Sequence, residues 1–198
     1  MTQPLRIAVA DDEADTREYL KELLPRLGHE VVAVGSGREL VDLCRASAPD
    51  LIITDIRMPD LSGIEAAHAV NREREVPVIL ITGHHEAEQL ARAGIDHVMA
   101  YLVKPIDAEQ LKATITLAVL RFQHYQALRK EAADLRQALE DRKVIERAKG
   151  AVVQRVGVPE AEAFRRLRKH ASDHNLKLVE VAKRILAAEE VFHALDQV

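Results

Sequence analysis

Short apolar runs alternate with amphipathic segments over the first half of the chain. Runs rich in Val, Ile and Leu predict buried strands, and apolar residues at i, i+3 and i+4 spacing predict the helices between them. The expected strands are 5–10, 30–34, 51–54, 76–81 and 98–103. Helices are expected before Gly28, with Pro25 interrupting near the end, and over 38–47, 63–73 and 86–93. Because parallel strands need crossover connections, this alternation predicts a doubly wound α/β sheet.

Polar residues follow four of the expected strands, namely Asp11 with Asp12, Asp55, Thr82 and Lys104. A lone Asp such as Asp55 often only ends a strand or caps a turn. However, the carboxyl ends of parallel strands meet at one edge of a sheet, so we expect these side chains to lie together. Three crowded carboxylates repel one another unless a divalent cation joins them, and Mg²⁺ prefers such oxygen ligands.

This set of residue types suits phosphoryl transfer. A carboxylate such as Asp55 can act as a nucleophile toward a phosphoryl group. The cation and the Lys104 ammonium would stabilise the phosphoryl oxygens, and the Thr82 hydroxyl could bond the bound phosphate. The sequence therefore favours a phosphoacceptor site.

The segment from Leu5 to about Arg121 closely resembles the receiver domain of two-component response regulators. The resemblance rests on Asp11-Asp12, Asp55, Thr82, Tyr101 and Lys104-Pro105, each at the end of an expected strand. It implies a flavodoxin-like five-stranded parallel sheet and phosphorylation of Asp55 by a sensor histidine kinase. Small phosphodonors are possible as well.

The same resemblance implies roles for the other residues. Asp12 and Asp55 would bind Mg²⁺ directly, with the backbone carbonyl of Arg57, and Asp11 would act largely through water. Lys104 would pair with the phosphate, and the Lys104-Pro105 bond would be cis. As switch residues, Thr82 would move toward the phosphate and Tyr101 would turn inward; alternatively, Tyr101 is only a partly buried strand aromatic.

Helix signals begin at Asp107 and meet no Gly or Pro until Gly150. Apolar residues repeat every seven positions in this segment, which predicts a coiled-coil seam broken at Thr114 and Arg121. The early part must pack on the sheet, so the free seam runs from about Phe122 to Leu139. Pairing with a second chain would bury it; alternatively, the helix folds back on its own tail. The seam residues are Leu111, Ala118, Tyr125, Leu128, Ala132, Leu135 and Leu139.

The last part of the chain predicts a small all-α three-helix bundle with a basic surface, since residues 142–184 hold 12 Lys or Arg against 5 Asp or Glu. The order of Ala148-Lys149-Gly150, Glu162-Ala163-Phe164 and Val181-Ala182 resembles an ANTAR domain from about Leu135 to Leu195. The resemblance implies RNA binding and transcription antitermination, by dimers acting on paired hairpin loops of leader transcripts. Any one basic residue could equally be a solvated helix charge. The expected RNA contacts are Arg142, Lys149, Arg165, Arg168 and Lys169.

Composition agrees with two tasks. Residues 1–121 hold 13 basic and 20 acidic residues, and 122–198 hold 15 and 12, so an acidic half precedes a basic one. With 3% aromatic residues, base stacking cannot dominate any nucleic-acid contact. The single cysteine, Cys44, rules out a disulfide framework within one chain, and no signal segment or long apolar run is present, which predicts a cytoplasmic protein without a membrane span.

These observations predict a receiver domain at 1–121, a coiled-coil linker helix at 122–138 and an ANTAR domain at 139–198. The expected function is a phosphorylation-switched, homodimeric RNA-binding antiterminator that is not an enzyme, because transfer to Asp55 modifies the protein itself. Two alternatives stay open: a DNA-binding response regulator, and a dimerising phosphorelay module without nucleic-acid output.

Overall fold

The structure, a computed structural model, describes residues 4–83 and 97–195. The chain divides into two compact units, Met1–Gln126 and Ala127–Val198, and helix α5 (Ala108–Val156) carries residues of both. The helix expected over 86–93 lies outside the described residues. No helix within the described ranges has the length and hydropathy needed to cross a membrane.

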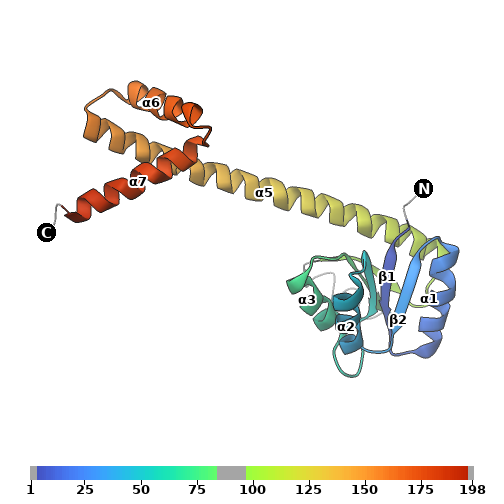
Figure 1. Ribbon diagram of the computed structural model, residues 1–198. Helices are drawn as coiled ribbons and strands as arrows, with labels where there is room; N and C mark the ends of the chain where they lie inside the picture. The colour runs from blue at the N-terminus through green and yellow to red at the C-terminus, as the bar shows by residue number, and fades with distance from the viewer. Residues whose placement is uncertain (1–3, 84–96, 196–198) are drawn as a thin grey trace. The chain divides into compact units, whose positions relative to one another are not determined.

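A five-stranded parallel sheet forms the centre of the first unit (Figure 1), in the order β2-β1-β3-β4-β5. Strand β3 is buried along its whole length, as its apolar sequence predicts. The predicted α/β class and the flavodoxin-like sheet are thus confirmed. The strands are β1 (Arg6–Ala10), β2 (Glu30–Val34), β3 (Leu51–Asp55), β4 (Val78–Thr82) and β5 (Val98–Val103).

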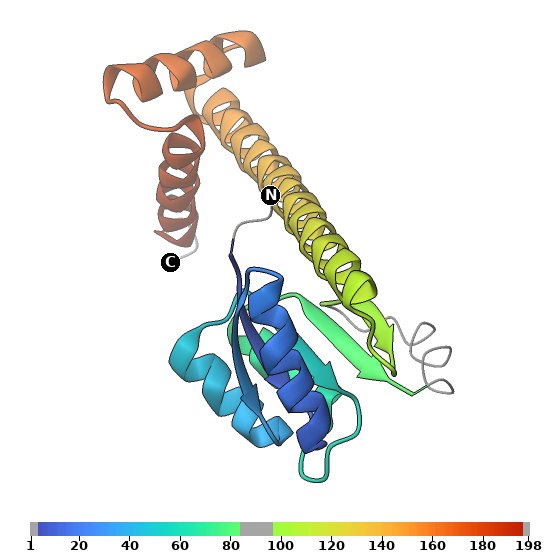
Figure 2. The same cartoon turned by 90° about the vertical axis from the view of Figure 1, so that its right-hand side faces the viewer.

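Helices cover both faces of this sheet because successive strand side chains point to opposite sides. Ile7 and Ile53 face a core shared with helix α1 (Ala14–Arg26) and the first turns of α5. Ala8 and Ile52 face a second core, shared with helices α2 (Gly37–Ser47) and α3 (Gly63–Glu73). In Figure 2 the dark-blue helix α1 lies in front of the sheet, on the first of these faces.

The element boundaries depart little from the predicted ones. Strand β4 begins at Val78, two residues later than expected, after Pro77, which has no N–H to donate to a ladder. Helix α1 contains Pro25 and ends one residue beyond it, at Arg26. A proline in the last turn removes a single helical hydrogen bond, so the helix shortens only slightly.

The second unit consists of the end of α5 with helices α6 (Glu160–Asp173) and α7 (Leu178–Leu195), as the predicted helical bundle requires. Helix α5 ends at Val156, and the next residue, Gly157, has a positive φ of 70° that suits a residue without a Cβ. The bundle core combines three buried residues with four partly buried ones, Leu167, Ala171, Val181, Val152, Leu176, Leu178 and Ile185.

The heptad seam of α5 serves two purposes. Leu111 and Ala118 are fully buried against the sheet, and Phe122 is 9% exposed in the same core. Tyr125 also packs on that core, with its ring edge-on to His97 at a centroid distance of 5.6 Å. The exposed part of the seam therefore begins after Tyr125, later than the expected start at Phe122. The leucines of this exposed part are Leu128, Leu135 and Leu139, which are 65%, 61% and 60% exposed, respectively.

Candidate functional site

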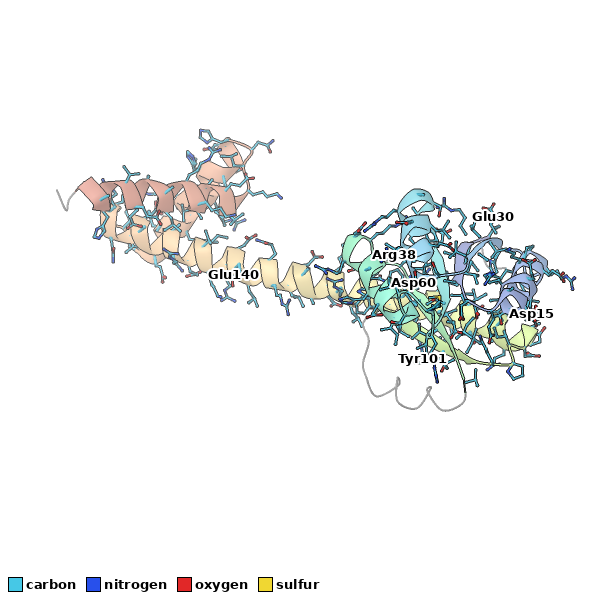
Figure 3. The ribbon with its side chains drawn as sticks, turned by 90° about the horizontal axis from the view of Figure 1, so that it is seen from below. Asp15, Glu30, Arg38, Asp60, Tyr101 and Glu140 are labelled. Carbon is cyan, nitrogen blue, oxygen red and sulfur yellow. The ribbon has the colours of Figure 1, made fainter. Side chains whose placement is uncertain are left out.

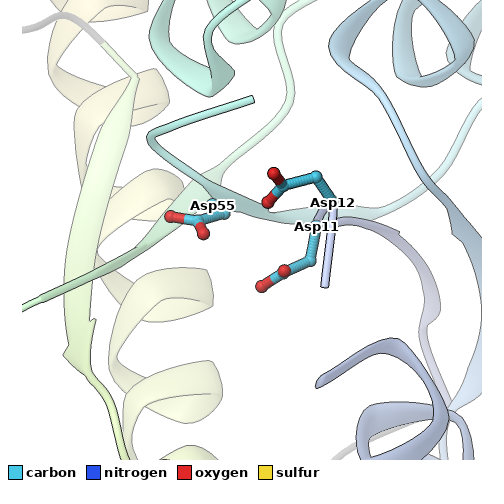
Figure 4. Close-up of side chains that lie close together, drawn as sticks. All are labelled: Asp11, Asp12 and Asp55. Atoms are coloured by element: carbon cyan, nitrogen blue, oxygen red, sulfur yellow. The ribbon is translucent and has the colours of Figure 1, made fainter. Parts of the chain in front are cut away.

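Three carboxylates converge at the rim formed by the carboxyl ends of β1 and β3 (Figure 4). Asp11, Asp12 and Asp55 each offer an oxygen atom, and these atoms lie within 4.8 Å of one another. Asp11 is fully buried, Asp55 is 9% exposed and Asp12 is exposed. The structure therefore brings together the carboxylates that the strand ends predicted.

The sheet register explains this convergence. Ala10 pairs with Thr54, so Asp11 and Asp55 follow neighbouring positions on adjacent strands. Asp55 pairs with Ile81, and Thr82 pairs with Val103, which directly precedes Lys104. The pairing of β4 with β5 shifts register between Val78 and Ile79, and beyond that point it runs evenly to Thr82. Parallel pairing therefore places all these side chains at the same edge.

Asp55 is held by the loop that follows it. Its Oδ1 accepts hydrogen bonds from the amides of Ile56 at 2.6 Å and Arg57 at 3.4 Å. The loop then returns to α3, whose first residue, Gly63, donates its amide to the Ile56 carbonyl at 3.0 Å. A Cβ on Gly63 would overlap the Asp55 carbonyl oxygen, so the close approach requires glycine.

The far end of the same loop is fixed on α2. Asp60 accepts hydrogen bonds from the amides of Gly37 and Arg38, both at 3.2 Å, at the amino terminus of that helix. A carboxylate is favourable there because the first helical amides have no internal partner. Asp60 and Arg38 lie close together in Figure 3.

Lys104 supplies a positive charge to the carboxylates. Its Nζ lies 3.0 Å from Asp55 Oδ2, 3.1 Å from Asp11 Oδ2 and 2.7 Å from Glu13 Oε2. Its amide donates to the Thr82 carbonyl at 3.1 Å, which joins the ends of β4 and β5. The Lys104-Pro105 peptide is cis, as the receiver resemblance implies.

The pKa shifts follow from these contacts. Burial raises the pKa of Asp11, and this effect exceeds the stabilisation from the Glu13 amide and from Lys104. Burial alone would lower the pKa of Lys104, but its close contacts with the carboxylates of Glu13, Asp55 and Asp11 raise it above the ordinary value. The ammonium is therefore charged at neutral pH, whereas burial disfavours the charged form of Asp11.

A divalent cation fits this donor set. In the described part of the rim, three carboxylates contact the one ammonium, and Asp12 adds a fourth carboxylate beside Asp11 and Asp55, so negative charge is in excess. Asp11 Oδ2 accepts no hydrogen bond within the described residues, although Lys104 lies at ion-pair distance. Buried oxygens of this kind are normally satisfied, and a hard cation such as Mg²⁺ would satisfy this one.

Thr82 and Tyr101 occupy the strands next to the acceptor. Thr82 is fully buried at the end of β4, and its hydroxyl donates to the Gly83 carbonyl at 3.0 Å. Tyr101, labelled in Figure 3, is partly buried on β5 against the core shared with α2 and α3. Burial raises the pKa of its phenol.

Two supporting residues carry no role in the sequence prediction. Glu13 approaches Lys104 more closely than either aspartate does. Arg17 Nη1 donates to the carbonyls of Asp11 at 2.8 Å and Asp12 at 2.9 Å, which holds the acidic turn. The run Asp11-Asp12-Glu13 is a signal for the first, whereas no sequence pattern indicates the second, because its partners are backbone carbonyls.

The predicted RNA-contact residues occupy two kinds of position in the second unit. Arg142, Arg168 and Lys169 are exposed and make no ion pair within the described residues. Lys149, in contrast, is only 15% exposed and joins Glu146 of its own helix to Glu160 of α6. Arg165 pairs with Glu162 at 2.7 Å.

A parallel five-stranded sheet with a carboxylate cluster and a lysine at its carboxyl rim defines the receiver class of signalling domains. The sequence matches the response regulator receiver domain over residues 7–116 and the ANTAR domain over residues 133–186. The chain therefore belongs to the two-component response regulators, with an ANTAR output domain of an RNA-binding class.

Similar proteins share one or both parts. The transcriptional regulatory protein PdtaR of Mycobacterium tuberculosis is 39% identical over 184 residues, which cover 92% of this chain and 90% of PdtaR. The regulatory protein AtoC of Escherichia coli is 34% identical over 140 residues, 70% of this chain and 30% of AtoC. A solved receiver domain from Clostridium thermocellum, 30% identical, matches 61% of this chain and 98% of its own with a TM-score of 0.55.

Proposed function

We propose that Asp55 accepts a phosphoryl group from a sensor histidine kinase and that this modification controls RNA binding by the second unit. The observation that carries the proposal is the buried Asp55 carboxylate, 3.0 Å from the Lys104 ammonium and beside two further carboxylates. In the transfer, an Asp55 oxygen forms a bond to phosphorus while the bond from phosphorus to the kinase imidazole breaks. The histidine leaves without the phosphoryl group, and small acyl phosphates could donate in the same way.

Mg²⁺ would be held by Asp12, Asp55 and the backbone carbonyl of Arg57, with Asp11 acting largely through water. When bound, the ion would offset negative charge on the phosphoryl oxygens. Lys104 would pair with one of those oxygens, since its Nζ already lies beside the acceptor carboxylate.

The switch in this proposal consists of Thr82, Tyr101 and Pro105. The Thr82 hydroxyl would exchange its bond to the Gly83 carbonyl for a bond to the phosphoryl group. Its movement would open space for the Tyr101 ring to turn inward. Pro105 follows Lys104 directly, so a change at Lys104 acts on the segment that leads into α5.

We further propose that the output is transcription antitermination, through binding of paired hairpin loops in leader transcripts. The receiver domain would comprise 1–121, the linker helix 122–138 and the RNA-binding domain 139–198. Exposed Leu128, Leu135 and Leu139 support pairing of the linker with a second copy, because apolar residues at heptad spacing need a partner to be buried. A homodimer would then present two output domains to two hairpins.

RNA contact would come from the basic residues already predicted. Arg142, Arg168 and Lys169 can neutralise phosphates without breaking an ion pair within the described residues. Lys149 and Arg165 would first have to leave Glu160 and Glu162, respectively. Unpaired cations thus favour the first three as the principal contacts.

A gel-shift titration tests this function against its two alternatives. Full-length protein, phosphorylated with Mg²⁺ and acetyl phosphate, is titrated with a two-hairpin RNA and with duplex DNA of equal length. We expect retention of the RNA at concentrations at which the DNA runs free. Preference for the duplex would identify a DNA-binding regulator, and binding of neither would leave only a dimerising phosphorelay module.

A further inference from the structure

Helices α6 and α7 of the second unit pack beside the last turns of α5 (Figure 1). A groove lies between side chains of these three helices. It has a volume of about 410 Å³, within the usual range for ligand-binding clefts. Its floor is apolar, formed by Val152, Leu167, Val181 and Ile185. A second hollow of about 250 Å³ continues it along α5 and shares Val152, Ile185 and Ala188.

The rim of the groove is basic. Arg166, Arg184 and His170 line the larger hollow, and Arg155 lines the smaller one, against the single acidic residue Glu189. Arg166 is held by Glu162 at 2.8 Å, whereas Arg184 makes no ion pair within the described residues. An apolar floor between guanidinium groups is complementary to a flat apolar ligand that carries phosphates on either side.

We propose that this groove receives one unpaired nucleobase of the RNA hairpin loop, while Arg166 and Arg184 contact the phosphates that flank it. This inference rests on the proposed RNA-binding function and adds the place where a base is held. Proteins recognise hairpin loops chiefly through bases that are splayed out and stacked on side chains, including guanidinium planes. The groove offers both the apolar surface and the guanidinium groups.

The charges disfavour a second copy as the occupant. Symmetric pairing through this groove would bring the arginines of both copies together, because a two-fold interface repeats the same residues on each side. Like charges facing each other across an interface are costly. The groove also differs from the predicted RNA-contact set, since Arg165, Arg168 and Lys169 do not line it.

The test starts from a hairpin RNA selected with the phosphorylated full-length chain from a library with a randomised loop. Each loop nucleotide is then replaced by an abasic one, and affinity is measured by fluorescence anisotropy. One position should show a 5- to 150-fold loss, the order expected for removing a stacked base. In Ala188→Glu, which fills the groove with a carboxylate, the intact and abasic RNAs should bind equally weakly.

Two further variants keep the test decisive. Arg184→Gln, an exposed substitution, should weaken binding and reduce the abasic penalty. The matched control Arg168→Gln lies outside the groove, so it should weaken both RNAs alike and leave the penalty unchanged. Circular dichroism establishes that each variant is folded.

The outcomes separate this inference from the function beneath it. An unchanged abasic penalty in both Ala188→Glu and Arg184→Gln would overturn the base site while RNA binding stands. If Ala188→Glu instead converts a dimer to a monomer in sedimentation, with the penalty unchanged, the groove is a protein interface. Failure to select any binding hairpin would overturn the proposed RNA-binding function and this inference with it.

Discussion

The receiver rim and the helical unit place their charges in opposite settings. At the rim, one lysine contacts three carboxylates, and Asp11 is withdrawn from solvent. In the helical unit, Arg168 and Lys169 extend into solvent and pair with no described residue. Buried charges require compensation, so the fold determines their positions, whereas exposed charges can serve many partners. The proposed chemistry therefore depends on individual rim residues, whereas the proposed RNA contact is shared among several helical residues.

The largest effect is expected at the acceptor. Asp55→Asn should abolish phosphate incorporation, because an amide does not supply the anionic nucleophile. Intact mass after incubation with Mg²⁺ and acetyl phosphate measures the modification. Asp12→Ala should also block it by removing a metal ligand, whereas Asp42→Asn, exposed on α2, should label like the parent. Phosphate on Asp55→Asn would show that the acceptor is another residue.

Much of the rim could be predicted from the sequence because strand ends are local signals. The apolar run ending at Asp55 and its counterparts determine which residues share an edge. The acidic run places Glu13 near the rim, but its contact with Lys104 could not be predicted, since it depends on the conformation of an exposed side chain between two distant parts of the sequence. The start of the exposed seam could not be predicted either, because Phe122 and Leu128 are both large apolar side chains on one continuous helix, although only Phe122 packs in the core on the sheet.

The next largest effect concerns the seam between the two regions. The double variant Leu128→Asp with Leu135→Asp should convert the proposed phosphorylated dimer into a folded monomer, because the new charges would face each other in the paired seam. Loss of the second binding site should weaken two-hairpin RNA binding by about 10²- to 10⁴-fold. The control is the double variant Lys130→Asp with Gln137→Asp, because heptad spacing places these two residues away from the seam. An unaltered dimer in sedimentation would exclude pairing through these leucines.

A smaller effect compares exposed with paired cations in the helical unit. Each cation that neutralises a phosphate adds about −0.7 to the slope of log affinity against log salt for single-stranded loops. Arg168→Gln should reduce the slope by about that amount. Lys149→Gln should reduce it less, because Glu146 and Glu160 already neutralise its ammonium. A larger reduction of the slope in Lys149→Gln than in Arg168→Gln would place the main RNA contact on α5.

The smallest effect concerns receiver stability away from the rim. Burial lowers the pKa of His29, which accepts the Leu5 amide at Nδ1. The unfolded chain therefore takes up a proton more readily, and the free energy of unfolding should fall as the pH drops below about 6.5, by at most about 1.4 kcal/mol per pH unit. In His29→Gln, this contribution to the fall of the free energy of unfolding with pH should be missing. Urea unfolding of both proteins at several pH values measures it. Parallel curves for the two proteins would contradict the assignment.

The most direct test of the account asks whether the two regions are coupled. The full-length chain and Asp55→Asn are titrated, with and without acetyl phosphate, against a two-hairpin and a one-hairpin RNA. Phosphorylation should tighten binding of the two-hairpin RNA by the parent, change the one-hairpin affinity much less and leave Asp55→Asn unaffected. Equal affinity for both RNAs, unmoved by phosphorylation of the parent, would contradict control of RNA binding by Asp55.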